Sequence, residues 1–445
     1  MSATRGDFFE LGKRGSTFAT ELRGALATFL TMAYILVANP MILRAAGVPF
    51  QSAVVCTALA AGVCSIAMGL FANFPVALAS GMGLNAIVAY QAAQMTGSWQ
   101  TAMGLVVVDG IVIFLLVLFG LRESVMNAIP RDLRLAIGAG IGFFIAFIGA
   151  VNARIIVVPG GTLAVLSKNP AATMPPVEFG RLASPETAVA AIGFMITAFL
   201  VARRVKGAIV LGILISTAIA LVWHVAVLPK EIGLNLSFEA AFKADVRGAL
   251  KLHLLPLLFA FILVDFFDTL GTITGISEQA GILDSNGRIP RLRRILLVDS
   301  LSALVGGMLG ASSVTSYIES AAGVAEGART GLHSVLVGVF FLLAVFLAPV
   351  VEIVPAAATA PALILVGFLM CCQIARINFG DLSTAIPAFI TFVTIPLTYS
   401  IAHGIGLGFI TFVVIKILSL RFREVHPLMY AVAAVFAAFF ISSAT

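Results

Sequence analysis

Apolar runs long enough to cross a lipid bilayer follow one another almost without a break from Ala25 to Ile441, and they constrain the fold more than any other feature. A transmembrane helix needs about 20 apolar residues. Every backbone N–H and C=O in lipid must find its partner within the protein, so helices are expected to make the crossings. Hydrophobic residues make up 60% of the chain and charged residues 11%. The chain is therefore predicted to be an all-α polytopic membrane protein.

The apolar runs divide into about fourteen transmembrane segments, in two sets of about seven. The first set is Ala25–Leu43, Ala53–Phe71, Val76–Tyr90, Ala102–Leu121, Leu133–Ala150, Thr187–Ala202 and Ala208–Val227. The second set is Leu254–Thr272, Ile295–Leu309, Ser313–Ala325, Leu332–Val350, Ala356–Ile374, Leu382–Ile401 and Gly404–Leu418. A further apolar stretch, Leu428–Ile441, fits either a terminal interfacial helix or an extra span.

The basic residues indicate orientation rather than nucleic-acid binding, although the formal net charge is +6. They lie in short clusters between apolar runs, and a cytoplasmic N-terminus puts every cluster on the cytoplasmic side, as the positive-inside rule requires. The clusters are Arg5, Lys13, Arg14 and Arg23; Arg122, Arg131 and Arg134; Arg203, Arg204 and Lys206; Arg288, Arg291, Arg293 and Arg294; Arg329; Arg376; and Arg421 with Arg423. The loops Asn152–Glu186 and Pro229–Lys251 would then face outward.

The third segment of each set is short and rich in small residues. Val76–Tyr90 contains Ser80 to Asn85 with two glycines, and Ser313–Ala325 contains Tyr317 to Gly323. An odd number of segments in each repeat makes the two repeats inverted. Short, broken segments at matching positions of inverted repeats point to a transporter's midplane binding site. The alternative is that the glycines only permit close helix packing.

Three carboxylates stand inside these apolar segments. Asp265 and Asp268 lie three residues apart on one helical face of the eighth segment, and Glu319 lies in the broken tenth segment. A charged side chain in hydrocarbon costs at least about 2.5 kcal/mol, so these acids are functional candidates. The alternative is that they bind backbone amides and stabilise the fold. Asp109 also interrupts an apolar run, and the sequence does not indicate its role.

An ionised carboxylate only accepts hydrogen bonds, so its ligand should carry N–H groups. Guanine and hypoxanthine present such groups, and half-helix N-termini at the broken segments, where Gly83 and Ser320 stand, would offer N–H groups to a base carbonyl. Asn85 is positioned to bind the ring edge. Phe266 and Phe267 are candidates for stacking on the base, although such residues commonly serve as plain packing.

Acids this close together in a low dielectric cannot all stay ionised, so at least one of Asp265, Asp268 and Glu319 is expected to hold a proton. A proton entering from outside would lower the charge of the loaded site, and proton and base would move together. Asp268 is the preferred proton carrier, because Asp265 and Glu319 are the better placed to bind the base.

The sequence resembles the AzgA-like purine permeases, a branch of the nucleobase/ascorbate transporter superfamily, along nearly its whole length. The motifs that carry the resemblance are Phe29–Ile35 with Asn39-Pro40, Gly81–Ala86, Asp265–Thr269 with Gly271-Thr272, and Tyr317–Ser320 with Arg329–Gly331. Ile87-Val88 departs from the aromatic pair expected after Asn85-Ala86, which leaves the choice of base open.

The resemblance implies two inverted sets of seven segments in two domains. The core domain would comprise residues 25–121 (segments 1–4) and 229–350 (segments 8–11), and the gate domain 122–228 (segments 5–7) and 351–445, after a cytoplasmic 1–24. It also implies proton-coupled import of hypoxanthine, guanine or adenine by an elevator-like motion, a homodimer, and a bacterial inner membrane. The family's base-binding acids fall on Asp265 and Glu319, its essential second aspartate on Asp268 and its asparagine on Asn85.

Other functions fit the residues less well. A carrier of another neutral base, such as uracil or xanthine, is the nearest alternative. Three acids without an arginine would repel an anion, and acids on two segments do not form the ring of a channel. No Ser/His/Asp or His-rich constellation suggests an enzyme, and no cofactor or metal is expected.

Overall fold

The computed structural model describes residues 8–120, 129–159, 162, 165, 177–181, 183–226, 236–283 and 289–443. Among the predicted features, Arg5, Arg122, Arg288, the Phe267 side chain and parts of the two outward loops lie outside the described residues.

The first half forms α1 (Phe18–Met32), α2 (Ile35–Ala45), α3 (Phe50–Ala67), the π-helical turn η1 (Met68–Ala72), β1 (Leu78–Ser80), α4 (Met82–Ile87), the π-helical turn η2 (Val88–Ala92), α5 (Ala93–Thr96), α6 (Trp99–Leu118), α8 (Arg131–Asn152), β2 (Ile156–Val157), β3 (Glu178–Phe179), α10 (Pro185–Ala202) and α11 (Ala208–Val222). The second half forms α12 (Val246–Ala249), η3 (Leu252–Leu254), α13 (Leu255–Ala280), α14 (Leu292–Leu309), β4 (Val314–Ser316), α15 (Ser320–Ala325), α16 (Gly331–Ala344), η4 (Val345–Leu347), α17 (Ala348–Val351), α18 (Ala356–Cys371), η5 (Cys372–Arg376), α19 (Leu382–Thr398), α20 (Ile401–Leu418), η6 (Phe422–Glu424) and α21 (Pro427–Ser443).

The apolar runs form helices, as predicted. Within the described part of the chain, 9 helical stretches are long and apolar enough to cross a membrane, which indicates a multi-pass membrane protein. Each predicted segment coincides with a helix or with a strand followed by a short helix. The first segment is two helices, α1 and α2, and the stretch at Leu428–Ile441 is the helix α21, which packs against α20.

The helices begin where the sequence offers capping side chains. Thr17, Ser98, Ser184 and Ser400 each accept a hydrogen bond from a backbone N–H in the first turn of α1, α6, α10 and α20. The long helix α13 ends at Gly281, whose φ of +63° suits glycine.

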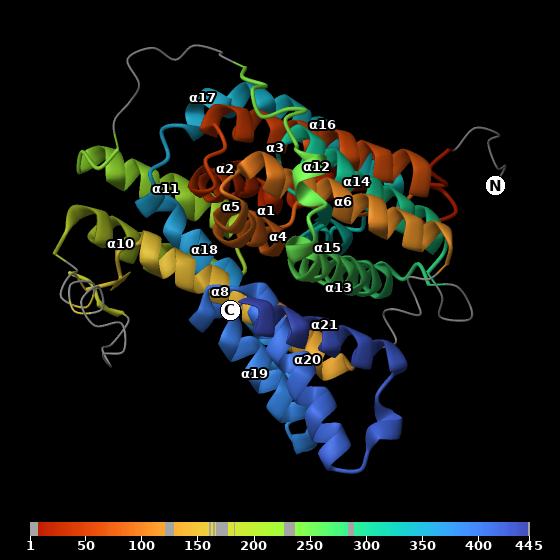
Figure 1. Cartoon of the computed structure of the whole chain (residues 1–445). Coiled ribbons are helices and arrows are strands. Elements are labelled where there is room, and N and C mark those ends of the chain that lie inside the picture. The colour runs from red at the N-terminus through yellow and green to blue at the C-terminus, as the bar shows by residue number, and fades with distance from the viewer. Residues whose placement is uncertain are drawn as a thin grey trace.

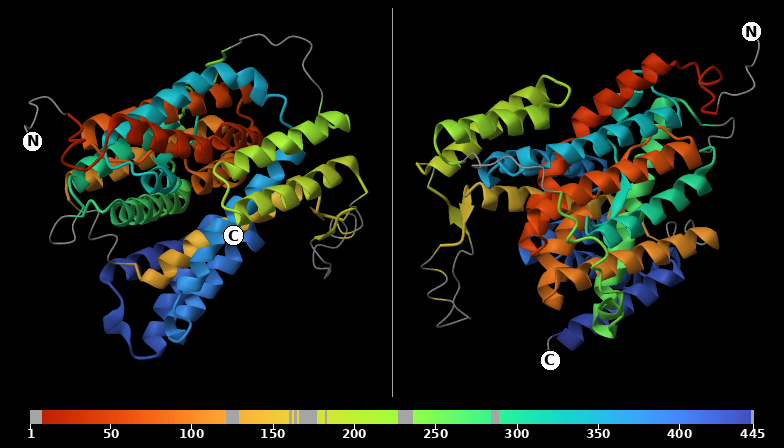
Figure 2. Two further views of the ribbon diagram at one scale, coloured as in Figure 1. Left: turned by 180° about the vertical axis from the view of Figure 1, so that it is seen from behind. Right: turned by 90° about the horizontal axis from the view of Figure 1, so that it is seen from above.

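Two bundles of helices lie side by side (Figures 1 and 2). In the first bundle α3 packs against α2, α14 and α16, and α6 packs against α14. In the second bundle α8 packs against α18 and α19, and α19 packs against α20. The pair α10 and α11 packs on α18. A hydrophobic core with Ile35 and Met103 of the first bundle and Phe144 and Phe409 of the second runs through both.

Glycines bring helices together within each bundle. A Cβ on Gly338 of α16 would lie 2.5 Å from the carbonyl oxygen of Gly62 on α3, and one on Gly367 of α18 would lie 2.4 Å from that of Gly142 on α8. Backbones therefore approach closely at these crossings, as membrane helices commonly do through small residues.

Contacts between the connecting segments respect the predicted sidedness. Connections predicted to be cytoplasmic contact one another: Arg14 donates to the Arg329 carbonyl, Arg291 pairs with Glu10, Lys206 with Glu326, and Arg293 donates to the Leu118 carbonyl. Connections predicted to be external do the same: Gln51 donates to Glu352, and Thr101 to Asp245. These contacts join connections that the sequence assigns to the same side of the membrane.

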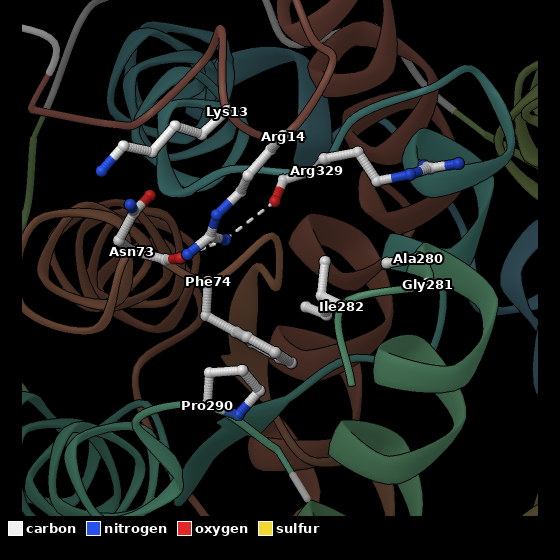
Figure 3. Close-up of a pocket in the computed structure, with 9 residues that line it drawn as sticks. All are labelled: Lys13, Arg14, Asn73, Phe74, Ala280, Gly281, Ile282, Pro290 and Arg329. Carbon is white, nitrogen blue, oxygen red and sulfur yellow. Dashed lines mark hydrogen bonds between the residues drawn. The ribbon is translucent and has the colours of Figure 1, made fainter. Parts of the chain in front are cut away.

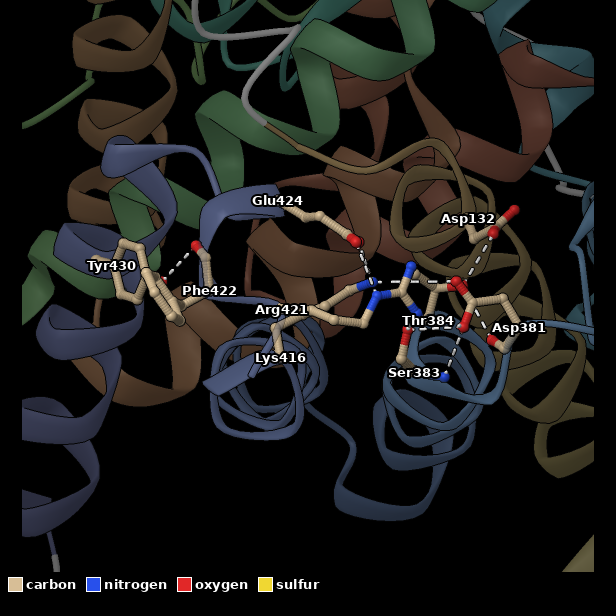
Figure 4. Close-up of polar contacts among 9 residues, drawn as sticks. All are labelled: Asp132, Asp381, Ser383, Thr384, Lys416, Arg421, Phe422, Glu424 and Tyr430. Atoms are coloured by element: carbon tan, nitrogen blue, oxygen red, sulfur yellow. Dashed lines mark hydrogen bonds and ion pairs between the residues drawn. The ribbon is translucent and has the colours of Figure 1, made fainter. Parts of the chain in front are cut away.

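Polar contacts fasten one end of the second bundle (Figure 4). Asp381 caps α19 through the Ser383 N–H and accepts a hydrogen bond from Arg421, which follows α20. Arg421 and Lys416 both donate to Glu424. These contacts hold the start of α19 beside the end of α20.

The two broken segments pair with each other. β1 and β4 form a short antiparallel ladder in which Leu78 faces Ser316 and Ser80 faces Val314. Hydrogen bonds from Gly81 N–H to Ser313 and from Tyr317 N–H to Ala77 continue the ladder at both ends. The short helices α4 and α15 therefore begin at opposite ends of one buried two-stranded element.

Candidate substrate-binding site

Asp265 lies in the middle of α13, beside the segment that leads into β4. Its side chain is 1% exposed. The Ser313 hydroxyl donates to one carboxylate oxygen at 3.0 Å, and the Thr269 hydroxyl lies 3.4 Å from the other. The eighth and tenth predicted segments are thus joined at the carboxylate that the sequence singled out.

Glu319 lies at the start of α15 and is half-buried. The Tyr34 hydroxyl, from the junction of α1 and α2, donates to its carboxylate at 2.9 Å. Tyr317 donates its hydroxyl to the Ser80 carbonyl in β1. These bonds fix the broken segment against α1 and β1, and they orient the Glu319 carboxylate.

One face of α13 changes from buried to exposed along its length. Leu257, Phe261 and Val264 are buried, and this half of α13 packs against α8, α20 and α21 of the second bundle. On the same face, one turn after another, Asp268, Gly271 and Glu278 are exposed. Asp268 is therefore accessible although it stands mid-helix.

Ile318, next to Glu319, is 52% exposed and approaches the same accessible face. Its Cδ1 would lie 3.7 Å from a Cβ on Gly275. A Cβ on Gly271 would have no other atom within 4 Å. The exposed residues of α13 and the segment that carries Glu319 therefore lie beside each other.

Asn85 and Gly83 lie in α4, close to the boundary between the bundles. The Asn85 side chain is completely buried, and both its amide nitrogen and oxygen lack a hydrogen-bond partner. A Cβ on Gly83 would lie 2.9 Å from Ile141 of α8 and 3.6 Å from Val264 of α13. Unpartnered buried amides are costly, so Asn85 has bonding capacity available to a ligand.

Two predicted base-contacting residues are engaged elsewhere in the first bundle. The Ser320 hydroxyl accepts a hydrogen bond from the Ala77 N–H at 3.0 Å and ties α15 to the start of β1. Phe266 is fully buried in a cluster with Leu78, Ile273 and Val314, on the side of α13 away from the accessible face. The Phe266 side chain thus lies apart from the accessible face, whereas Ser320 adjoins Glu319 but has its hydroxyl bonded to β1. Asp109 lies fully buried in α6.

The structure adds Asp299 of α14, which the sequence reasoning missed. Its side chain is 0% exposed, and Thr269 donates to it at 2.6 Å. Ser316 of β4 donates both its N–H, at 3.1 Å, and its hydroxyl, at 2.8 Å. Asp299 interrupts the apolar ninth segment, so the criterion that selected the other acids applies to it equally.

A cavity of about 430 Å³ lies away from these acids, at the end of the first bundle (Figure 3). Its lining includes Lys13, Arg14 and Arg329. Arg14 donates to the carbonyls of Asn73 and Arg329, and Arg329 donates to carbonyls at the end of α15. The guanidinium groups therefore satisfy carbonyls at chain turns and helix ends, where the dipole favours cations. In the part of the chain described, no group of three His, Cys, Asp or Glu side chains is arranged to hold a metal ion.

Comparisons with known proteins indicate the family and the fold of the chain. The family described as "Permease family" matches residues 19–407. The adenine permease AdeQ of Escherichia coli is 41% identical over 98% of this chain and 96% of its own, and the guanine/hypoxanthine permease PbuG of Bacillus subtilis is 38% identical over 98% and 99%. The transmembrane domain of the cyanobacterial bicarbonate transporter BicA has a TM-score of 0.63 at 16% identity, covering 87% of this chain and 97% of that one, which shows a shared fold.

Proposed function

The chain belongs to the permease family, and we propose that it is a secondary active importer of purine nucleobases that moves each base together with a proton. The substrates named for its relatives, adenine in one and guanine or hypoxanthine in another, support a purine. One structural observation carries the proposal. The carboxylates of Asp265 and Glu319 lie on two elements joined through β4, beside an accessible face of α13 at the boundary between two bundles.

In the proposed complex, the base binds at this boundary. Asp265 and Glu319 accept hydrogen bonds from its N–H groups, and Asn85 bonds the ring edge with the amide that has no protein partner. Gly83 lets α4 approach the second bundle closely. A bidentate contact with N1–H and an exocyclic amine suits guanine, whereas adenine offers an amine beside a ring nitrogen that needs a donor, such as a protonated acid.

We propose that the first bundle, with α13 and the paired broken segments, is the core domain and the second bundle, with α10 and α11, the gate domain of an elevator-like transporter. The antiparallel pairing of β1 with β4 supports two inverted repeats of seven segments. The sidedness of the connections supports about fourteen crossings and an N-terminus on the cytoplasmic side. The exposed half of α13 then opens toward the cytoplasm. The working unit is a homodimer in the bacterial inner membrane.

The proposed proton coupling rests on the presence of three carboxyl groups, those of Asp265, Asp268 and Glu319, at one site. Asp268 is exposed, so it can exchange a proton with water, while Asp265 and Glu319 bind the base. Neutralising one acid lowers the charge that the core carries past the gate, which favours movement of the loaded form. Asp268 is the proposed proton carrier.

Another neutral base such as uracil or xanthine is the nearest alternative. The shared fold with a bicarbonate transporter brings an anion carrier into consideration, but carboxylates at the site oppose an anion. Uptake of labelled adenine, guanine, hypoxanthine, xanthine and uracil by cells without purine carriers tests the proposal. We expect saturable uptake of a purine that is lost in Asp265→Asn. Uptake of none of the purines would overturn it.

A further inference from the structure

Asp299 is a buried carboxylate without a role in the transport cycle described above. It accepts hydrogen bonds from the Thr269 hydroxyl of α13 and from both the N–H and the hydroxyl of Ser316 in β4. The Thr269 bond, at 2.6 Å, has the length of a hydrogen bond to an ionised carboxylate. Asp299 thereby connects the helix that carries Asp265 with the strand that leads to Glu319.

The Thr269 hydroxyl has one proton and three oxygens within reach. Asp299 lies at 2.6 Å, Thr315 at 3.0 Å and Asp265 at 3.4 Å. The Asp299 oxygen, as the nearest acceptor, receives most of this hydrogen bond, and Asp265 keeps only a weak share of it. Asp299 therefore sets how strongly the Thr269 hydroxyl donates to Asp265, and it can do so without touching the base.

We propose that Asp299 is a positioning residue that, through Thr269, controls how readily Asp265 stays ionised for base binding, and through Ser316 holds β4 and the Glu319 segment in place. The proposal rests on the proposed function, because it concerns the same site.

The geometry gives opposite consequences for two substitutions. In Asp299→Asn the amide oxygen can take the Ser316 donors, and the amide nitrogen can donate to Thr269. The Thr269 proton then turns to Asp265, because an ionised carboxylate is a stronger acceptor than the neutral Thr315 hydroxyl, and it stabilises the ionised form of Asp265. Thr269→Val keeps the shape but removes the hydroxyl, so Asp265 loses this donor and takes up a proton more easily.

The titratable groups facing this network are Asp268 on α13, Glu319 and Tyr317 after β4, and the Cys64 thiol on α3. Of the other helices packed against α13 and α14, α6 carries Asp109, and α4 has no titratable side chain. The ionisable side chains of α8 and α20 stand near helix ends, at Arg131, Asp132, Arg134, His403 and Lys416. Both variants keep these groups, so a difference between their pH profiles reports on the Thr269 network.

The experiment is equilibrium binding of a labelled purine to the purified full-length protein across the acidic range. We expect the pH at which binding falls by half to move down by about one pH unit in Asp299→Asn. In Thr269→Val it should move up by a smaller amount, because that variant takes only the weak contact from Asp265. Ser277→Ala is the matched control, because Ser277 is also buried on α13 but donates to the carbonyl of Ile273. It should show no shift.

The proposal is overturned if Asp299→Asn and Thr269→Val keep the parent's thermal stability and the pH of half-maximal binding moves in the same direction in both, or does not move. If Thr269→Val fails to fold, Asp299→Asn decides the matter: a downward shift supports the role and any other result excludes it. Thr269→Ser, which keeps a hydroxyl, should return the profile toward that of the parent. A parent protein that binds no purine would instead overturn the proposed function itself.

Discussion

Replacing Glu319 by glutamine should weaken purine binding without preventing folding. The Tyr34 hydroxyl donates to one Glu319 oxygen at 2.9 Å, and a glutamine oxygen can still accept this bond. The other side of the group, however, changes from an acceptor to an N–H₂ donor and meets the N–H of the base. Losing a hydrogen bond to a charged group costs about 1.5–3 kcal/mol. At about 1.4 kcal/mol for each factor of ten, affinity should fall roughly 10- to 150-fold.

Binding of labelled purine to purified protein, with thermal unfolding in parallel, provides the measurement. Glu278→Gln is the matched control, since Glu278 is also an exposed acid but lies near the end of α13, on the face that carries Asp268 and Gly271. It should bind like the parent. Tyr34→Phe removes one donor but keeps the carboxylate, so its loss should be smaller. Parent-like affinity in Glu319→Gln would show that the base binds elsewhere.

Three further outcomes are expected. Asn85→Ala should change selectivity among bases more than it lowers transport of all of them, because its amide has no protein partner; uptake ratios for labelled bases measure this, and a uniform loss would make Asn85 structural. Cysteines at Lys206 or Arg293 should resist an impermeant thiol reagent added outside intact cells, and rapid labelling would reverse the orientation. Hydrogen bonds from Ser383 lower the pKa of Asp381, so the stability it contributes is present above its unfolded value, about 3.9, and lost as pH falls through the lower folded value. In thermal unfolding Asp381→Asn should therefore lose less stability on acidification than the parent, and an equal loss would refute the assignment.

The sequence predicted the fold well where hydropathy and helix length coincide. The broken third and tenth segments could be recognised because short, small-residue stretches cannot span as helices. Their pairing through β1 and β4 could not, because the ladder joins residues far apart in the chain. α13 continues to Ala280 rather than ending at Thr272, because polar residues such as Ser277 and Glu278 end the hydropathy run without ending the helix.

The acids of the candidate site could be predicted because an ionisable side chain within an apolar segment is costly and marks a functional candidate. This criterion found Asp265, Asp268 and Glu319, and it would have found Asp299, which shares its helix with the basic residues of a cytoplasmic connection. The partners of these acids were not predictable. Tyr34 and Ser313 reach their carboxylates across the fold, and neither contact leaves a pattern in the sequence.

Coupling of purine movement to protons is the central claim, and transport in proteoliposomes tests it most directly. With an acidic exterior the purified protein should concentrate labelled purine inside, and a protonophore should abolish the accumulation. Asp268→Asn should still bind base and exchange it across the membrane without concentrating it, because the proposed proton carrier is gone. Accumulation by Asp268→Asn as strong and as protonophore-sensitive as in the parent would exclude Asp268 as the carrier, and parent accumulation indifferent to the proton gradient would contradict proton coupling altogether.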